Sequence, residues 1–225
     1  MAKQKLKRFA EVATFPNTFQ HMPTSPILKN FKLKGKWREE YFKNDNPIVL
    51  ELGCGRGEYA VGLAEQFKDK NFIGIDIKGA RIWKGAKDAL AKDLKNVAFL
   101  RARVDRIDKL FSEKEVDEIW ITFPDPQLQK PKEHKRLTSP DFIGLYREIL
   151  KDGGIVHLKT DNRPFFDYTL EIVKKLKLDL VFATSNLYEN SHQFNFPEGL
   201  LSIRTFYENL FMGKGFPICY CQFKL

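Results

Sequence analysis

The fold is decided at Ile48-Val-Leu-Glu-Leu-Gly-Cys-Gly-Arg-Gly57, where an apolar run ends in a loop with three alternating glycines. A segment with helical spacing follows at residues 58–66, and a second apolar run occupies residues 71–76. A strand, a glycine loop, a helix and a further strand in this order predict a parallel β-α-β unit. In such sheets ligands bind beyond the carboxyl ends of the strands, so we expect the glycine loop to face a ligand.

The rest of the chain continues this alternation. The predicted strands are residues 48–52, 71–76, 97–102, 116–123, 153–159, 178–183 and 217–223. The predicted helices are residues 58–66, 80–94, 139–150 and 164–176. Apolar strands between amphipathic helices favour an α/β fold, in which a mostly parallel sheet of seven strands carries helices on both faces. The polar stretch 185–203 has little periodicity, and we interpret it as a functional loop.

Composition excludes several classes of protein. The chain has 225 residues, of which 43% are hydrophobic and 30% charged, as in a globular protein with a sizeable core. No apolar run approaches the roughly 20 residues that a membrane-spanning helix needs, and no signal peptide opens the chain. Three cysteines exclude a disulfide scaffold and predict the reducing cytoplasm. Cys219 and Cys221 alternate on a predicted strand, so they cannot share a metal, and we expect no metal site. We expect a monomer or a homodimer.

Two segments carry most of the positive charge. Residues 1–46 hold ten Lys and Arg against four acids, an excess of six out of the formal net charge of +9. Turns with proline interrupt this segment, so we expect a basic, partly disordered N-terminal arm over residues 1–46 ahead of a domain over 47–225. Such an arm either binds nucleic acid or keeps the protein soluble. The second basic cluster, residues 130–136, follows the fourth predicted strand.

Two acids indicate the class of ligand. The glycine spacing is G-x-G-x-G rather than the G-x-G-x-x-G of dinucleotide-binding proteins, and Glu51 ends the strand before it. A carboxylate would repel a pyrophosphate, whereas the sulfonium and amino groups of S-adenosylmethionine are cationic. Asp76 ends the next strand, about 20–25 residues on, where an acid hydrogen-bonds ribose hydroxyls. The structural alternatives are a helix-capping or surface acid at Glu51 and an Asx turn at Asp76.

Further segments make the chain resemble the class I S-adenosylmethionine-dependent methyltransferases and, more narrowly, the bacterial tRNA (guanine-N7)-methyltransferases. The matching segments are Glu51-Leu-Gly-Cys-Gly-Arg-Gly57, Phe123-Pro-Asp-Pro126, Lys135-Arg-Leu-Thr138, Leu158-Lys-Thr-Asp-Asn162, Thr205-Phe-Tyr-Glu208 and Gly213-Lys-Gly215. The first is generic to methyltransferases, and the later ones are specific in their order and spacing. The resemblance covers residues 48–225 and implies a Rossmann-like methyltransferase fold.

The resemblance also implies the reaction and a role for each matched residue. A methyl group would pass from S-adenosylmethionine to N7 of the variable-loop guanine at tRNA position 46, leaving S-adenosylhomocysteine. Asp125 would be catalytic. The donor would be held by Glu51, Gly53, Gly55, Asp76, Arg103, Val104 and Asp125. The substrate would contact Gln129, Lys130, Asp161, Thr205, Phe206, Tyr207 and Glu208. Apart from the resemblance, the basic patches near the predicted cleft make Lys130, Lys132, Lys135 and Arg136 candidates for contacts with RNA phosphates, as are Lys159 and Arg163 near the end of the fifth strand.

The chain departs from the family pattern at two places. The family commonly has Ser-Asp-Pro-Trp-Pro-Lys where this chain has Pro124-Asp-Pro-Gln-Leu-Gln129. The lysine expected to contact the substrate is therefore Gln129 here, with Lys130 next to it. The acid that contacts the donor's adenine aligns with Arg103, so the backbone at Arg103 and Val104 takes that role, and Asp105 is out of register.

The implied chemistry agrees with the residues. Guanine N7 carries a lone pair and no proton, so its methylation needs alignment with the methyl–sulfur bond rather than a strong base. Asp125 and Asp161 are suited to accept hydrogen bonds from guanine N1–H and its amino group. N7 lies in the major groove, which is too deep and narrow to be read in A-form RNA, so the target guanine must lie outside a regular helix.

Other functions remain open at this point. The chain could methylate another RNA, a protein amide or a small molecule, although no Asn-Pro-Pro-Tyr or Asp-Pro-Pro-Tyr motif follows the fourth strand. A dinucleotide-dependent oxidoreductase is disfavoured by the glycine spacing and Glu51. A non-catalytic RNA-binding module on the same fold is the remaining alternative.

Overall fold

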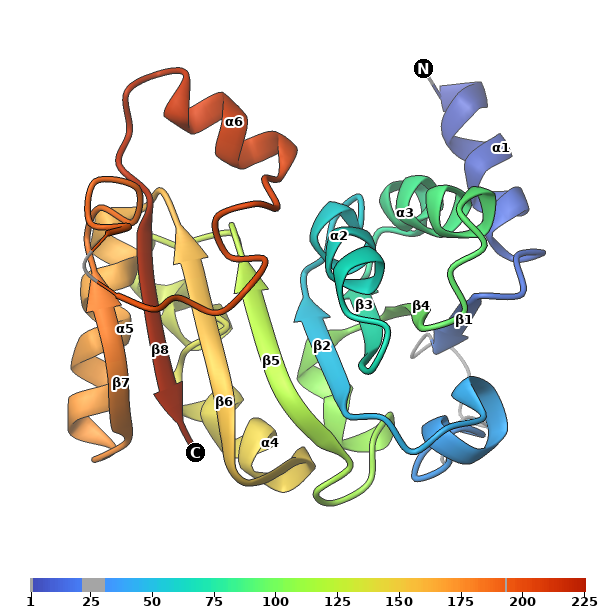
Figure 1. Ribbon diagram of the computed structural model, residues 1–225, viewed down its shortest axis with the longest axis horizontal. Helices are drawn as coiled ribbons and strands as arrows, with labels where there is room; N and C mark the ends of the chain where they lie inside the picture. Colours follow the sequence, from blue (N-terminus) through green and yellow to red (C-terminus); the bar gives the residue numbers. More distant parts are fainter. Residues whose placement is uncertain (1, 22–30, 193) are drawn as a thin grey trace.

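The computed structural model describes residues 2–21, 31–192 and 194–225. One eight-stranded sheet runs through it in the order β1-β4-β3-β2-β5-β6-β8-β7 (Figure 1). The strands are β1 (Thr18–His21), β2 (Ile48–Leu52), β3 (Asn71–Asp76), β4 (Val97–Ala102), β5 (Val116–Thr122), β6 (Leu150–Thr160), β7 (Asp179–Thr184) and β8 (Cys219–Lys224). The helices are α1 (Ala2–Val12), α2 (Glu58–Gln66), α3 (Gly79–Ala91), α4 (Pro140–Ile149), α5 (Arg163–Lys175) and α6 (Phe206–Met212). Shorter helical segments are η1 (Trp37–Phe42), η2 (Val104–Lys109) and η3 (Lys130–Lys135).

The predicted α/β fold is confirmed, but the predicted number of strands is wrong. The sheet has eight strands, because β1 pairs in parallel with the edge strand β4. β1 is only four residues long and lies in the basic segment, so it gives no periodic apolar signal. The antiparallel pairs are those that β8 forms with β6 and β7.

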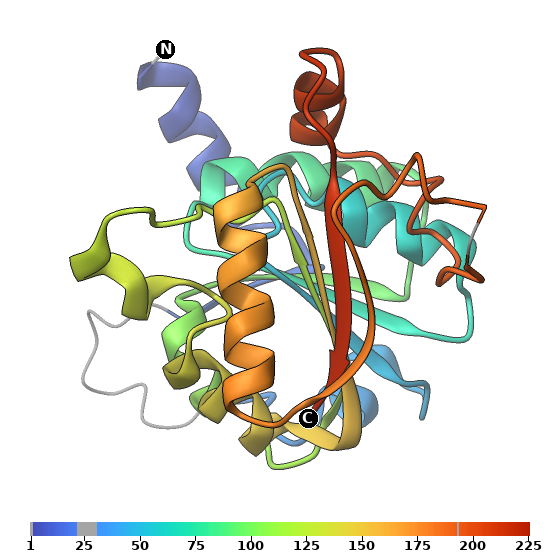
Figure 2. The same cartoon turned by 90° about the vertical axis from the view of Figure 1, so that its left-hand side faces the viewer.

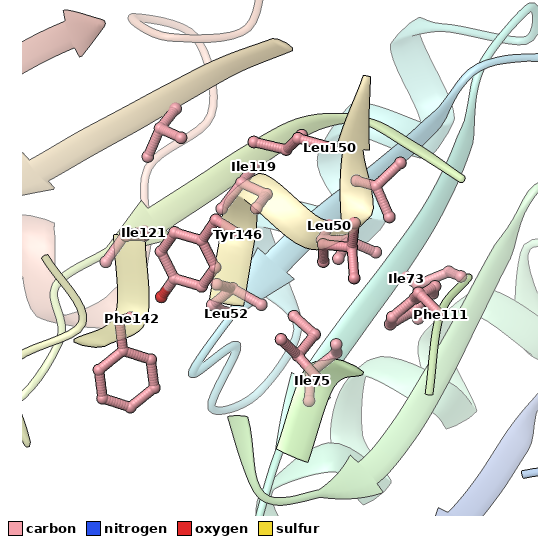
Figure 3. Close-up of a cluster of buried hydrophobic side chains, with 14 of the residues drawn as sticks. Leu50, Leu52, Ile73, Ile75, Phe111, Ile119, Ile121, Phe142, Tyr146 and Leu150 are labelled. Carbon is pink, nitrogen blue, oxygen red and sulfur yellow. The ribbon is translucent and has the colours of Figure 1, made fainter. Parts of the chain in front are cut away.

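Both faces of the sheet are covered by helices. Because side chains alternate along a strand, Leu50 and Leu52 of β2 point to one face and Val49 to the other. The first face packs against α4 and α5, and Figure 3 shows Ile119 and Ile121 of β5 beside Phe142 and Tyr146 of α4 there. The second face packs against α2 and α3, around buried residues such as Tyr59, Ile82, Phe99 and Trp120.

The described part of residues 1–46 contacts the rest of the fold. In addition to β1, it contributes Trp37, which has no exposed surface and donates from Nε1 to the carbonyl oxygen of Leu110 at 3.2 Å. Trp37 also stacks on Phe111, with ring centroids 5.7 Å apart. Trp37 therefore belongs to the core. The expected partial disorder falls in part on residues 22–30, which lie outside the described residues.

The carboxyl ends of β2, β3, β4, β5 and β6 meet along one edge of the sheet, which we call the carboxyl edge. Parallel pairing of these neighbouring strands makes them end on the same side. Helices α1 and α6 rise beyond this edge (Figures 1 and 2). Among the described residues, no helix is long and apolar enough to cross a membrane.

Candidate active site

The glycine loop lies at the centre of the carboxyl edge, between β2 and α2. Gly53 and Gly55 have φ values of +72° and +54°, which glycine adopts without strain. A Cβ built on either residue meets no neighbouring atom closer than 3.9 Å, so the space beside this backbone is open. Gly57 differs, because a Cβ there would lie 2.4 Å from Cε1 of Phe99. The first two glycines thus give access to a ligand, and the third allows α2 to pack closely on the sheet.

Glu51 is held rigidly at the end of β2. Its carboxylate accepts a hydrogen bond at Oε1 from the Thr122 hydroxyl (2.8 Å) and one at Oε2 from the backbone N–H of Ala60 (2.9 Å). The helix-capping alternative is therefore observed, since Ala60 lies in the first turn of α2. Burial raises the pKa of Glu51 to about 8, although these two hydrogen bonds oppose the shift. A buried carboxylate of this kind is suited to a cationic ligand.

Asp76 connects the glycine loop to the start of α3. Its Oδ2 accepts from the backbone N–H of Gly55 (3.0 Å), and its Oδ1 accepts from the backbone N–H of Lys78 (2.7 Å). The second contact is the Asx turn expected as the structural alternative. A carboxylate has about four lone-pair positions, so these two bonds leave acceptor capacity for a ligand.

Asp125 lies in an exposed turn that follows β5. Phe123 and Gln127, two residues before and after it, have positive φ values of +47° and +45°, which are uncommon for residues with a side chain. Asp125 itself accepts from the backbone N–H of Gln127 at 3.1 Å. Strained backbone of this kind is concentrated at functional sites, and it holds this carboxylate at the carboxyl edge.

The other strands bring further predicted residues to the same edge. Arg103 and Val104 follow β4, and the exposed Arg103 side chain donates from Nε to Oδ1 of Asp105 at 2.9 Å. Asp105 is therefore engaged by its neighbour. Asp161 follows β6 and is half-buried, and its burial raises its pKa.

The segment Thr205 to Glu208 forms the start of α6 and contacts the glycine loop and the first turn of α2. Thr205 and Glu208 form a capping box, in which the Thr205 hydroxyl accepts from the Glu208 backbone N–H at 3.1 Å. The backbone N–H of Phe206 donates to Oε2 of Glu58, in the first turn of α2, at 2.8 Å. Arg56 of the loop also lies 4.7 Å from the Phe206 ring centroid. Phe206 and Tyr207 are exposed, whereas Glu208 is fully buried.

Four polar groups meet below α6. Lys159 Nζ lies 2.6 Å from both Glu208 Oε1 and the carbonyl oxygen of Leu200. The Tyr188 hydroxyl donates to the same Glu208 oxygen at 2.5 Å. The expectation that Lys159 contacts RNA phosphates is wrong, because Lys159 has no exposed surface. Sequence reasoning did not find Thr122, Glu58 or Tyr188, whose partners lie far away along the chain.

The basic cluster at residues 130–136 projects from the molecule as η3 (yellow-green in Figure 2). Gln129, Lys130, Lys132 and Lys135 are exposed there. Arg136 is turned inward, since its side chain is only 11% exposed and its guanidinium lies 4.2 Å from the Tyr168 ring centroid. Its Nε also donates to the carbonyl oxygen of Pro126 at 3.3 Å. Arg136 thus supports the Asp125 turn from behind.

Comparison with known proteins shows the family. A family model described as "putative methyltransferase" matches residues 45–220. The tRNA (guanine-N(7)-)-methyltransferase of Bacteroides fragilis is 48% identical over 225 residues, which are 100% of this chain and 87% of that protein. The enzyme of the same name from Christiangramia forsetii is 48% identical over 224 residues, covering 100% of this chain and 99% of that protein. The chain belongs to the tRNA (guanine-N7)-methyltransferase family.

Other comparisons extend this family assignment. The Listeria monocytogenes tRNA (guanine-N(7)-)-methyltransferase is 33% identical over 199 residues, or 88% of this chain and 89% of that protein. Among solved structures, the 16S rRNA methyltransferase KamB matches with a TM-score of 0.63 at 14% identity, over 83% of this chain and 91% of that chain. This structural likeness shows the methyltransferase fold alone. Membership of the tRNA (guanine-N7)-methyltransferase family confirms the resemblance and excludes the dinucleotide-dependent oxidoreductase.

Proposed function

We propose that this chain transfers a methyl group from S-adenosylmethionine to N7 of the guanine at tRNA position 46. The observation that carries the proposal is the common location of Glu51, Asp76, Asp125 and Asp161, which lie at or just after the ends of four neighbouring strands at one edge of the sheet. Two of these acids border an open glycine loop, and the other two lie on the side of β5 and β6. This arrangement supports a donor site beside a site for a planar base.

The residues at the loop fit the methyl donor. S-adenosylmethionine, when bound, supplies an electrophilic methyl group on a cationic sulfonium. Glu51 is buried with both oxygens oriented and has a raised pKa, and a bound cation would favour its ionised form. Asp76 keeps acceptor positions for ribose hydroxyls, and the open space over Gly53 and Gly55 allows close approach to the backbone. The backbone at Arg103 and Val104 is proposed to border the adenine.

The chain's role in the chemistry is positioning. Guanine N7 needs no proton removed, so Asp125 and Asp161 act as hydrogen-bond acceptors that orient the base rather than as general bases. The strained turn holds Asp125 in place, and Asp161 lies half-buried after β6 at the same edge. Exposed Phe206 and Tyr207 at the start of α6 supply aromatic faces next to the loop. Glu208 is buried and forms an ion pair with Lys159, so we propose that it fixes the position of α6 rather than contacting the substrate.

The target guanine must be presented outside a regular helix, which suits the variable loop of a tRNA. Gln129 and Lys130 stand at the start of η3, and Lys132 and Lys135 follow with exposed charge for phosphates. A tRNA substrate also implies that the protein works in the cytoplasm. A monomer or a homodimer is compatible with this arrangement.

The proposal is tested by transfer of labelled methyl from S-adenosylmethionine to bulk tRNA that lacks modification, followed by nucleoside analysis. We expect 7-methylguanosine, and its loss in a tRNA whose position 46 is changed to adenine. Ribosomal RNA serves as the competing substrate. If the label entered ribosomal RNA or protein but not tRNA, the chain would be a methyltransferase with another substrate. If the donor bound but no label was transferred to any of them, the protein would be a binding module.

A further inference from the structure

A second basic surface lies on α1 and α3, apart from η3 and from the residues assigned above. We call it the α1/α3 surface, and its cations are Lys5, Lys7, Arg8, Lys78, Arg81, Lys84 and Lys87. Only two acids, Glu11 and Asp88, lie on these two helices. Each acid is already engaged, Glu11 by Trp83 Nε1 at 2.6 Å and Asp88 by Lys84 Nζ at 2.6 Å.

The α1/α3 surface is held in a fixed shape. Trp83 of α3 carries Arg8 and Lys87 near its ring, with their charged groups 4.8 and 4.9 Å from the ring centroid. Helix α1 also contacts β4, where the Arg101 guanidinium lies 4.0 Å from the ring centroid of Phe9. The Arg8–Trp83 cation–π contact and the part-buried hydrogen bond from Trp83 to Glu11 dock α1 on α3, so the cations of both helices form one surface.

Several of these cations remain free to bind a partner. Within residues 2–21, 31–192 and 194–225, Lys5, Lys78 and Arg81 form no ion pair within 4.0 Å. Lys7 is 77% exposed and reaches Glu11 only at 3.9 Å, a contact that contributes little in water. Unpaired cations held close together repel one another and so destabilise the folded state. Their presence on one surface therefore indicates that they bind an anionic partner.

The position of the surface relates it to the carboxyl edge. Lys78 stands two residues after Asp76, and Arg81 lies in the first turn of α3. Strand β3, which leads to α3, and strand β5, which leads to η3, pair with opposite sides of β2. The two basic surfaces therefore flank the glycine loop, and α1 extends its side beyond the edge (Figure 1).

We propose that the α1/α3 surface binds backbone phosphates of the tRNA, away from the base that is methylated. The inference rests on the proposed function. A folded tRNA extends far beyond one nucleotide, so a site flanked by two basic surfaces can hold its backbone on both sides. Because no base edge needs to be read there, lysine and arginine on exposed helix faces suffice.

The test measures tRNA binding as a function of salt for two variants that lose the same charge. The first is Lys5→Gln/Lys7→Gln/Arg81→Gln on the α1/α3 surface. The control is Lys174→Gln/Lys175→Gln/Lys177→Gln at the exposed end of α5, which lies away from the carboxyl edge (Figure 2). Binding of S-adenosylmethionine and thermal unfolding show that each variant is folded.

We expect the α1/α3 variant to bind unmodified tRNA about tenfold or more weakly at low salt. The slope of log affinity against log salt should become shallower by about one for each lost phosphate contact, hence by about three. The control should keep the wild-type slope. Equal slopes for wild type and both variants would overturn the inference. An equal loss of tRNA affinity in both variants would also overturn it, because the loss would then follow from net charge alone. If wild type bound tRNA but made no 7-methylguanosine, the proposed function would fail while this binding result still stood.

Discussion

Lys159 Nζ lies 2.6 Å from Glu208 Oε1, and neither side chain has any exposed surface. The two residues come from different family motifs, one at the end of β6 and the other in the first turn of α6. Their ion pair, completed by the Tyr188 hydroxyl and the Leu200 carbonyl, fastens α6 above the carboxyl edge. The pair therefore fixes where Thr205, Phe206 and Tyr207 stand relative to the glycine loop.

Removing one member of this pair should strongly destabilise the protein. Lys159→Met leaves the Glu208 carboxylate buried without its cation, and such a loss costs about 3–5 kcal/mol in the free energy of unfolding. The double variant Lys159→Met/Glu208→Met should lose less than the sum of the two single variants. Urea denaturation measures these values, with exposed Lys174→Met as the control. A cost below about 1 kcal/mol for Lys159→Met would contradict the role of the pair.

Ionisation of Glu51 should make the stability depend on pH. Its pKa is about 4.3 in an unfolded chain, and burial raises it to about 8 in the fold. Between these values the folded state keeps a proton that the unfolded state has lost, so the contribution to stability is full below about pH 4.3. It is lost as pH rises towards 8, by about 1.4 kcal/mol per pH unit. Unfolding measured from pH 5 to 8 should show this decline.

The matched control is Glu51→Gln, which keeps the shape and removes the titration. Its unfolding free energy should fall less steeply over the same pH range. A cationic donor favours ionised Glu51, so the affinity of the wild type for S-adenosylmethionine should rise with pH up to about 8. Parallel pH profiles for the two proteins would assign the titration to another group.

Asp125→Ala should nearly abolish methyl transfer while leaving tRNA binding largely intact. Asp125 is exposed and makes its described hydrogen bond only to the Gln127 backbone, so its removal should cost little stability. Transfer rates and tRNA affinity are measured side by side, with exposed Asp141→Ala in α4 as the control. Equal loss of both properties in Asp125→Ala would point to a folding or binding role instead.

The basic cluster of η3 should divide into two kinds of residue. Lys132→Gln/Lys135→Gln should weaken tRNA binding and flatten its salt dependence by about two, because both lysines are exposed. Arg136→Gln should leave that slope unchanged and lower the unfolding temperature, because Arg136 packs on Tyr168. A shallower salt dependence of tRNA binding in Arg136→Gln would instead indicate that Arg136 contacts a phosphate.

Gly57→Ala should be one of the most damaging small substitutions. Its φ is +70°, and the added Cβ would lie 2.4 Å from Phe99 and 3.3 Å from Cα of Gly85, so α2 would have to shift. We expect a loss of about 2 kcal/mol or more in the unfolding free energy. The control is Gly144→Ala in α4, where a Cβ meets nothing within 4 Å and helix propensity predicts a gain of about 0.5–1 kcal/mol. Similar effects at both positions would contradict the packing explanation.

The sequence by itself determined the seven strands from residue 48 onward, the helices α2 to α5 between them and the acids at four strand ends, but not the helix α6. It could do so because parallel strands joined by right-handed crossovers end on one edge, so residues after successive strands must come together. Glu51, Asp76, Asp125 and Asp161 therefore lie at the carboxyl edge as expected, while their roles stay predictions. The four-residue β1 escaped prediction, since an edge strand so short has no readable period.

Only the tertiary structure decided which charged and aromatic side chains face solvent. Lys159 and Arg136 have the sequence context of phosphate-binding residues, yet one is paired with Glu208 inside the protein and the other lies on Tyr168. Trp37, in a basic segment, is buried in the core. The physical reason is that the exposure of a long side chain depends on partners supplied by distant segments. The local sequence around a residue does not show which distant residues will pack against it.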